Sequence, residues 1–398
     1  MAGTGLAQAL PFLAAPLLTR LYSEKDFAFY TSFFAIASIL AVAVGGRYQY
    51  AIILPKDDSE AVKVFMLSVY ITAIFATLLS VILFIFYFIQ NHSIDPKSWL
   101  IPLYLLFFGI WSSLSNLSIR NRKFRNNSFA KILQSLFYVL VAAGFGLFQP
   151  KVYGLVIGKI SGTLASLIFL FKKSSVKFFL EPLKNFREVA YRYKDHPRYG
   201  IIPALLDVAS VQGIVIILTK AYSTNELGYF GLTALVFSAP IGLIGGSFKE
   251  VFYQKIASHI NNREFERAIM VFKKSALYLF VFALPVSIIA YFFGEDIFKF
   301  AFGERWAKSG EFASILSVSF LFQLVVSPLS SVFYAANKLK PAFMWQSLYF
   351  MTTYLTLGIS AFAFNLKVET LLTVYVVHEA TLHTIYFLVQ YMTLKKLD

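Results

Sequence analysis

Four charged residues lie away from the ends of long apolar stretches of the chain: Arg47, Lys159, Asp207 and Glu379. On membrane-insertion scales, a Lys, Arg or Asp near the centre of a spanning helix costs about 2.5–3.5 kcal/mol, so such a residue usually faces water, a partner or a substrate. Arg and Lys are the side chains that bind phosphate groups, Arg as a planar fork and Lys as a point charge. Arg47 and Lys159 therefore indicate a cationic surface for an anionic substrate.

Each cation also has a plainer interpretation. Arg47 lies close enough to the predicted cytoplasmic end of its stretch for its side chain to reach the headgroups. Lys159 lies deeper, and an ion pair with a carboxylate is its alternative role. Arg20 and Lys220 lie at the ends of two stretches, where they either extend the cationic surface or anchor a helix at the headgroups.

The acidic residues and two histidines suggest proton chemistry. Glu379 and His383 are four residues apart, so they share one face of a helix, and His378 is adjacent to Glu379. Histidine titrates near neutral pH, so this group and Asp207 are candidates for proton coupling. A structural hydrogen-bond network, or an ion pair with Lys159, is the alternative. The spacing does not fit a zinc motif, and no metal site is expected.

Composition places these residues in a bilayer. Of 398 residues, 58% are hydrophobic and only 14% are charged, whereas about 25% is usual for soluble proteins. The aromatic-rich, unalternating stretches exclude a membrane β-barrel, and the fold expected is all-α. A spanning helix needs ~20 apolar residues, and twelve stretches qualify: 1–19, 27–54, 62–90, 100–119, 129–148, 153–171, 199–221, 226–250, 275–293, 312–334, 342–365 and 370–393.

The formal net charge of +15 reflects membrane topology, not nucleic-acid binding. If the twelve stretches span the membrane, the loops on one side carry 25 Lys and Arg residues and those on the other side carry nine. Cytoplasmic loops collect Lys and Arg, so both termini are predicted to be cytoplasmic. The chain has no cysteine, which excludes a disulfide, a thiolate metal site and a cysteine nucleophile.

An internal repeat predicts two related halves. The decamer LTRLYSEKDF at 18–27 aligns without a gap with LTKAYSTNEL at 218–227, and the same offset aligns Gly45-Gly46 with Gly245-Gly246. A repeat of six spans keeps its orientation, so the halves are expected to be parallel copies with a substrate cavity between them. The predicted parts are an N-lobe at 1–171, a basic amphipathic cytoplasmic linker at 172–198, and a C-lobe at 199–398.

No loop is long enough to form a soluble domain, and no phosphate-binding Gly-Lys-Ser/Thr loop is present. We therefore expect no cofactor and no catalytic residue, and energy from an ion gradient or from the substrate itself.

Several motifs carry a family resemblance: GLAQALP at 5–11, PLLTRLYS at 16–23, RYQYAIILPKDD at 47–58 and LGYFGL at 227–232. With these motifs the chain resembles the Wzx-like oligosaccharide flippases of bacterial polysaccharide synthesis, which belong with the MurJ and MATE transporters. The resemblance implies a MATE-like fold of two six-helix lobes in the bacterial cytoplasmic membrane. It implies as partners a polyprenyl-diphosphate-linked glycan, membrane lipids and polysaccharide polymerase or assembly proteins.

Three other functions are compatible with a polytopic membrane protein. A MATE-type cation-coupled drug antiporter would share the fold but should favour acidic cavity residues over Arg47 and Lys159. A membrane glycosyltransferase or polymerase would need a sizeable outer loop with paired carboxylates, which the chain lacks. A purely structural scaffold would not explain charges at membrane depth.

Overall fold

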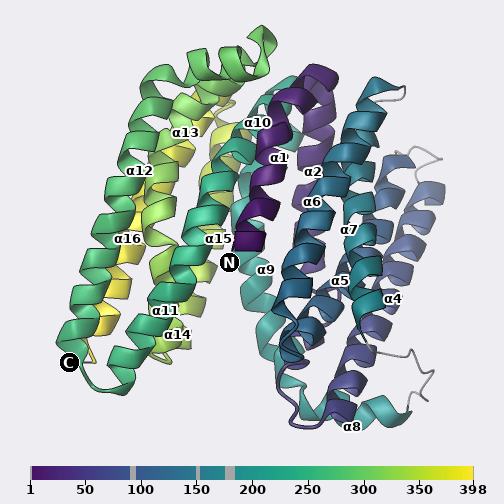
Figure 1. The fold of residues 1–398 in the computed structure, drawn as a ribbon. Helices are drawn as coiled ribbons and strands as arrows, with labels where there is room; N and C mark the ends of the chain where they lie inside the picture. The colour runs from purple at the N-terminus through teal and green to yellow at the C-terminus, as the bar shows by residue number, and fades with distance from the viewer. Residues whose placement is uncertain (1, 90–95, 149–152, 175–183, 398) are drawn as a thin grey trace. The chain divides into compact units, whose positions relative to one another are not determined.

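The computed structural model describes residues 2–89, 96–148, 153–174 and 184–397, and within these ranges it contains helices and no strand (Figure 1). The first nine α-helices are α1 Ala2–Leu21, α2 Glu24–Ala41, α3 Tyr48–Ala51, α4 Asp58–Ile89, α5 Leu100–Arg120, α6 Phe124–Leu147, α7 Gly154–Lys173, α8 Lys184–Arg192 and α9 Asp195–Ala221. The remaining ones are α10 Thr224–Pro240, α11 Gly246–Asn261, α12 Phe265–Phe302, α13 Ala307–Val326, α14 Val332–Ala335, α15 Leu339–Gly358 and α16 Val368–Lys395.

The all-α membrane fold is confirmed. In the described ranges, nine helical segments are long and apolar enough to cross a membrane. The other three predicted spans correspond to α1, α2 and α15, which are not among these nine. The observed helices are consistent with twelve spans, and that exact number stays a prediction.

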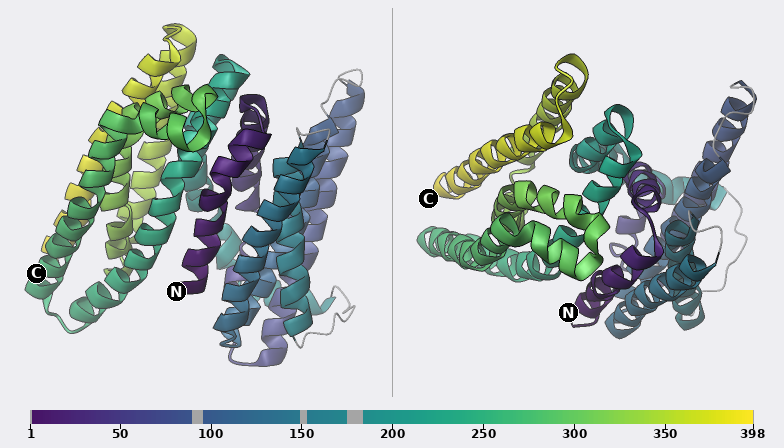
Figure 2. Two further views of the ribbon diagram at one scale, coloured as in Figure 1. Left: turned by 45° about the horizontal axis from the view of Figure 1, so that its top comes forward. Right: turned by 90° about the horizontal axis from the view of Figure 1, so that it is seen from above.

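The chain forms two compact units. Unit 1 comprises residues 1–14 and 32–212, and unit 2 comprises 15–31 and 213–398. In unit 1, α6 packs along α7, and α5 packs on α4 and α7. In unit 2, α13 packs on both α12 and α16 (Figure 2). The lobe boundaries predicted from the repeat stay a prediction, because this division follows packing and not sequence duplication.

The repeated decamer marks the same local structure in both copies. Ser223 accepts a hydrogen bond from the Glu226 backbone N–H, and the Glu226 carboxylate accepts one from Ser223 N–H. Ser23 and Asp26 make the same reciprocal pair at the start of α2. This capping box satisfies backbone donors at a helix start, which explains why both copies keep Ser and an acidic residue three positions later.

The two copies differ at the aligned glycine pairs. The apolar stretch 27–54 is not one helix, because α2 ends at Ala41 and a turn over 42–47 leads into α3. Within that turn, Gly46 has φ +59° and Arg47 has φ +62°. The second copy stays helical through a π-helical segment, η3 Ile241–Gly245, into α11. Pro240 precedes that segment, and a wider turn accommodates its missing N–H.

Three helix connections share one form. Arg122, Arg263 and Asn337 each adopt positive φ between two helices. In each case the next backbone N–H bonds to a carbonyl five residues earlier, for example Glu264 N to His259 O at 2.8 Å. This is the Schellman helix ending, in which glycine usually holds the left-handed position. Arginine there is less favourable by roughly 1 kcal/mol, and it supplies charge in two loops predicted to be cytoplasmic.

The predicted amphipathic linker is helical over α8. Its apolar residues Phe186 and Val189 are buried, and the Phe186 ring lies 5.2 Å from that of Tyr70 on α4. Arg192 pairs with Glu60 at 2.5 Å, which fastens the end of α8 to the start of α4. The apolar face therefore packs on protein and not on lipid. The sequence spacing of Phe179, Leu183 and Phe186 predicts one apolar helix face, and the first two of these residues lie outside the described ranges.

Candidate functional site

Arg47 is presented by a break in the helical backbone. Its guanidinium carbon lies 4.8 Å from the ring centroid of Tyr50. A Cβ at Gly200 of α9 would lie 3.7 Å from Arg47 Cγ and Nε, so a bare glycine faces the arginine stem. Within the described part of the chain, no carboxylate lies within 4.0 Å of Arg47. A left-handed, unpaired arginine at a helix break is strained, as functional residues often are.

Lys159 lies next to the face through which α7 packs on α6. A Cβ at Gly158 would lie 2.8 Å from the Tyr138 carbonyl oxygen, and one at Gly162 would lie 2.2 Å from that of Gln134. The two backbones therefore touch through glycines, as small residues allow in membranes. Lys159 is partly buried, and its Nζ lies 5.8 Å from the Tyr138 ring centroid.

The ion pair considered for Lys159 is absent from the described residues, because no carboxylate lies within 4.0 Å of its Nζ in those ranges. Asp207 belongs to the same unit as Lys159 and does not pair with it directly, whereas the pair with Glu379 of unit 2 stays a prediction. Lys159 and Arg47 both belong to unit 1. Each is a half-buried cation without a carboxylate partner among the described residues, so each is available to pair with another anionic group.

The other predicted residues occupy helix ends and an exposed position. Arg20 and Lys220 are exposed in the last turns of α1 and α9, where the helix dipole favours cations and headgroup anchoring is equally compatible. Asp207 is exposed on α9, twelve residues after its start, or about 18 Å along the helix. Its predicted role in coupling stays a prediction.

Glu379 is the centre of a buried polar cluster in unit 2. The residue is 3% exposed, and the Tyr349 hydroxyl contacts both carboxylate oxygens, at 2.8 and 3.0 Å. His378 Nδ1 lies 3.6 Å from one carboxylate oxygen, and His383 Nδ1 lies 3.5 Å from the other. The structure thus brings together the three residues that the sequence singled out on α16.

Two residues of this cluster, Tyr349 and Thr352, lie on α15 and were not predicted from the sequence. Tyr349 stacks on His378 with a ring separation of 6.3 Å, and Thr352 Oγ1 lies 3.1 Å from His378 Nε2. His378 Nδ1 is buried and makes no hydrogen bond. A carboxylate and two imidazoles within reach of a phenol can hold and pass a proton. Within the described ranges, no cluster of His, Cys, Asp and Glu has the geometry of a metal site.

The motif at 47–58 begins with Arg47 and ends with Asp58, whose contacts stabilise the fold. Arg120, in the last turn of α5, pairs with Asp58 and donates to the Pro55 carbonyl oxygen at 2.9 Å. Its side chain is largely buried, whereas that of Asp58 is exposed. Arg120 therefore fixes the loop that enters α4, so this part of the motif serves folding.

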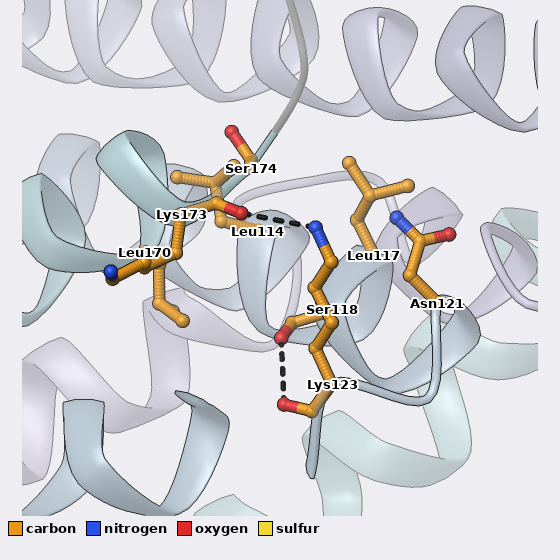
Figure 3. Close-up of a pocket in the computed structure, with 8 residues that line it drawn as sticks. All are labelled: Leu114, Leu117, Ser118, Asn121, Lys123, Leu170, Lys173 and Ser174. Carbon is orange, nitrogen blue, oxygen red and sulfur yellow. Dashed lines mark hydrogen bonds between the residues drawn. The ribbon is translucent and has the colours of Figure 1, made fainter. Parts of the chain in front are cut away.

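A small pocket lies between the C-terminal ends of α5 and α7 (Figure 3). Leu114, Leu117 and Leu170 contribute apolar walls, and Lys123 Nζ closes one side by donating to the Lys173 carbonyl oxygen at 3.1 Å. The pocket measures about 10 Å³, room for about one water. It cannot hold a sugar or a diphosphate.

Comparison with known proteins agrees with this architecture. Residues 17–311 match the sequence profile of the family described as polysaccharide biosynthesis protein. No curated protein sequence shows a significant match.

Solved structures show the same fold. An inward-facing multidrug resistance MATE family transporter of the MOP superfamily has a TM-score of 0.74 at 14% identity, covering 98% of this chain and 95% of that one. The lipid II flippase MurJ in an inward closed conformation has a TM-score of 0.71 at 13% identity, covering 100% and 89%. A MOP superfamily transporter from Pyrococcus furiosus, described by the reverse polarity of its binding pocket, has a TM-score of 0.65 at 12% identity, covering 100% and 94%.

Proposed function

Because the chain belongs to the polysaccharide biosynthesis protein family, we propose that it is a flippase that moves polyprenyl-diphosphate-linked oligosaccharides from the inner to the outer leaflet of the bacterial cytoplasmic membrane. The observation that carries the proposal is the pair of half-buried cations, Arg47 and Lys159, that have no carboxylate partner among the described residues. An unpaired cation at membrane depth is favourable only when an anion or water meets it.

The chemistry of such a substrate fits these residues. A diphosphate with polar sugars cannot cross hydrocarbon unaided, whereas its polyprenyl tail is stable in lipid. Arg47 can hold two phosphate oxygens at once, and Lys159 can add a point charge with more positional freedom. Arg20 and Lys220, at helix ends in unit 2, are further candidate contacts for an anionic headgroup. The fold shared with MurJ, a lipid II flippase, supports a lipid-linked substrate moved by alternating access.

Glu379 is the candidate coupling group. Its cluster with His378, His383 and Tyr349 lies in unit 2, whereas Arg47 and Lys159 lie in unit 1. Binding or loss of a proton at Glu379 would change which contacts between α15 and α16 are favourable, and so bias one conformation over another. Both termini are then cytoplasmic, the chain is a transporter without catalytic residues, and polymerase or assembly proteins use the flipped glycan afterwards.

The test is the side on which lipid-linked sugar accumulates. In the host strain deleted for the gene, periodate should oxidise the lipid-linked sugar in inverted membrane vesicles but not in right-side-out ones. Restoring the gene should return sugar to the outer face. Equal outer-face labelling with and without the gene would contradict the proposal.

A MATE-type antiporter is the second candidate, because the TM-score to a multidrug transporter is 0.74 and Glu379 is a buried acidic residue. Efflux of a cationic dye from cells separates the two functions. A flippase should leave dye retention unchanged when the gene is deleted, whereas an antiporter should lose efflux and keep surface polysaccharide.

A further inference from the structure

The corner between α1 and α2 is held by side chains from a distant part of the chain. The turn at Gly303–Trp306, which joins α12 to α13, lies against this corner within unit 2. Arg305 donates to the Thr19 carbonyl oxygen and, at 2.6 Å, to that of Tyr22. Trp306 Nε1 also donates to Thr19 O, at 3.2 Å. The last carbonyls of a helix have no partner within the helix, so these donors complete the end of α1.

Packing reinforces the hydrogen bonds. The Trp306 side chain is fully buried and meets the Phe27 ring edge-on at 5.0 Å. Two glycines of α10 allow α2 to approach closely. A Cβ at Gly228 would lie 2.0 Å from the Glu24 carbonyl oxygen, and one at Gly231 would lie 2.1 Å from Thr31 Oγ1. The α1–α2 corner is therefore held by hydrogen bonds at the end of α1 and by close packing of α2 against α10.

The partners in this contact come from different copies of the repeat. The α1–α2 corner contains the first decamer, 18–27, whereas Gly303–Trp306 follows the second. A turn in the first copy, η1 Pro96–Trp99, also ends in tryptophan and precedes a helix, α5. Its Trp99 is partly exposed, whereas Trp306 is fully buried. The contacts of Arg305 and Trp306 with the α1–α2 corner therefore join the first copy of the repeat to the second. They are not contacts within a single copy.

We propose that Arg305 and Trp306 form a latch that holds the α1–α2 corner to the second copy and must release before the substrate can leave on the outer side. The inference rests on the proposed function. It also rests on the asymmetry of Lys and Arg between the loops, which predicts that the α1–α2 corner and the Gly303–Trp306 turn both lie on the outer side of the membrane. Hydrogen bonds to main-chain carbonyls suit a releasable contact, because the freed carbonyls can bond to water once they are exposed.

The cysteine-free sequence allows a direct test. Glu24 and Arg305 lie with side-chain atoms 4.0 Å apart, so the double variant Glu24→Cys, Arg305→Cys can be bridged by a membrane-impermeant bis-methanethiosulfonate added to intact cells. The matched control is Lys308→Cys, Glu369→Cys, a contacting pair within the second copy alone. Each bridged variant is compared with its own reduced form for new surface polysaccharide per unit of membrane protein.

Bridging Glu24 to Arg305 should reduce new surface polysaccharide at least tenfold, with recovery after reduction, and bridging the control pair should change it less than twofold. Undiminished polysaccharide with Glu24 bridged to Arg305 would overturn the latch. Failure of the cysteine-free parent to support polysaccharide would instead count against the proposed function.

A second readout does not depend on transport. Thr19 is fully buried, so a cysteine at Thr19→Cys should react slowly with an impermeant maleimide. Adding Arg305→Ala should raise that rate several-fold, and Arg305→Lys should give an intermediate rate. An unchanged rate with Arg305→Ala would show that the arginine does not hold the corner closed.

Discussion

Replacing Lys159 by methionine should lower the transport activity per molecule without lowering the amount of protein in the membrane. Methionine keeps the length of the side chain and removes the charge. Lys159 has no carboxylate partner within 4.0 Å in the described ranges, so its loss leaves no buried anion unpaired. A lysine at membrane depth costs about 2.5–3.5 kcal/mol on insertion scales. Lys159→Met should therefore be at least as abundant in the membrane as the parent.

Activity should fall by an amount that the lost contact sets. A hydrogen bond to a charged group is worth about 1.5–3 kcal/mol, which corresponds to a factor of roughly 10 to 150 in affinity or rate. Lys159→Arg should keep part of the activity, because the charge remains while the larger head must fit beside Tyr138. The measurement is surface polysaccharide in the deletion strain, divided by the amount of the variant in the membrane.

Lys131→Met is the matched control. Lys131 is a partly buried lysine on the neighbouring helix α6, near its predicted cytoplasmic end, where it is expected to act as an anchor. Its replacement should leave activity per molecule within about twofold. Full activity of Lys159→Met would refute the role of this cation in substrate binding. Loss of protein in proportion to activity would show instead that Lys159 serves folding.

Three further substitutions test helix packing, backbone strain and membrane topology. Gly162→Leu should destabilise the protein in thermal unfolding by at least the 1–3 kcal/mol typical of overpacking, because even a Cβ would lie 2.2 Å from a backbone oxygen; Gly144→Ala, which meets nothing within 4 Å, is the control. Arg263→Gly should raise stability by roughly 1 kcal/mol, because φ there is +58°, and Arg263→Ala should not. A thiol at Ser174→Cys should resist an impermeant reagent added outside intact cells, and rapid labelling would contradict the predicted topology.

Sequence periodicity and charge predicted the fold because both are imposed by the bilayer. Twenty apolar residues must form a helix in hydrocarbon, and this fixed most helix positions to within a few residues. The backbone conformation at the aligned glycine pairs, Gly45-Gly46 and Gly245-Gly246, could not be predicted in the same way. Gly46 and Arg47 break the first copy, whereas Pro240 leads into a π-helical turn in the second. That difference depends on local backbone geometry, which the shared glycines do not specify.

The candidate site was partly predictable for a similar reason. Glu379 and His383 could be paired from their spacing, because both lie on one helix. Tyr349 and Thr352 could not, since their place beside His378 depends on how α15 packs against α16. The same holds for Arg305, whose acceptors lie 286 and 283 residues away in the chain. Contacts between distant helices leave no periodic signal in a single sequence.

The placement of Arg47 and Lys159 in unit 1 and of Glu379 in unit 2 bears on the choice between flippase and antiporter. A fold shared at 12–14% identity hosts different substrates, so substrate class must depend on a few side chains. An antiporter for cations would need its acidic residue to meet both proton and drug, and Glu379→Gln would then abolish transport as substrate binding fails. In a flippase for an anionic lipid, Arg47 and Lys159 bind the substrate while Glu379 biases the conformation. Glu379→Gln should then leave substrate binding intact and stop only its coupling to the gradient.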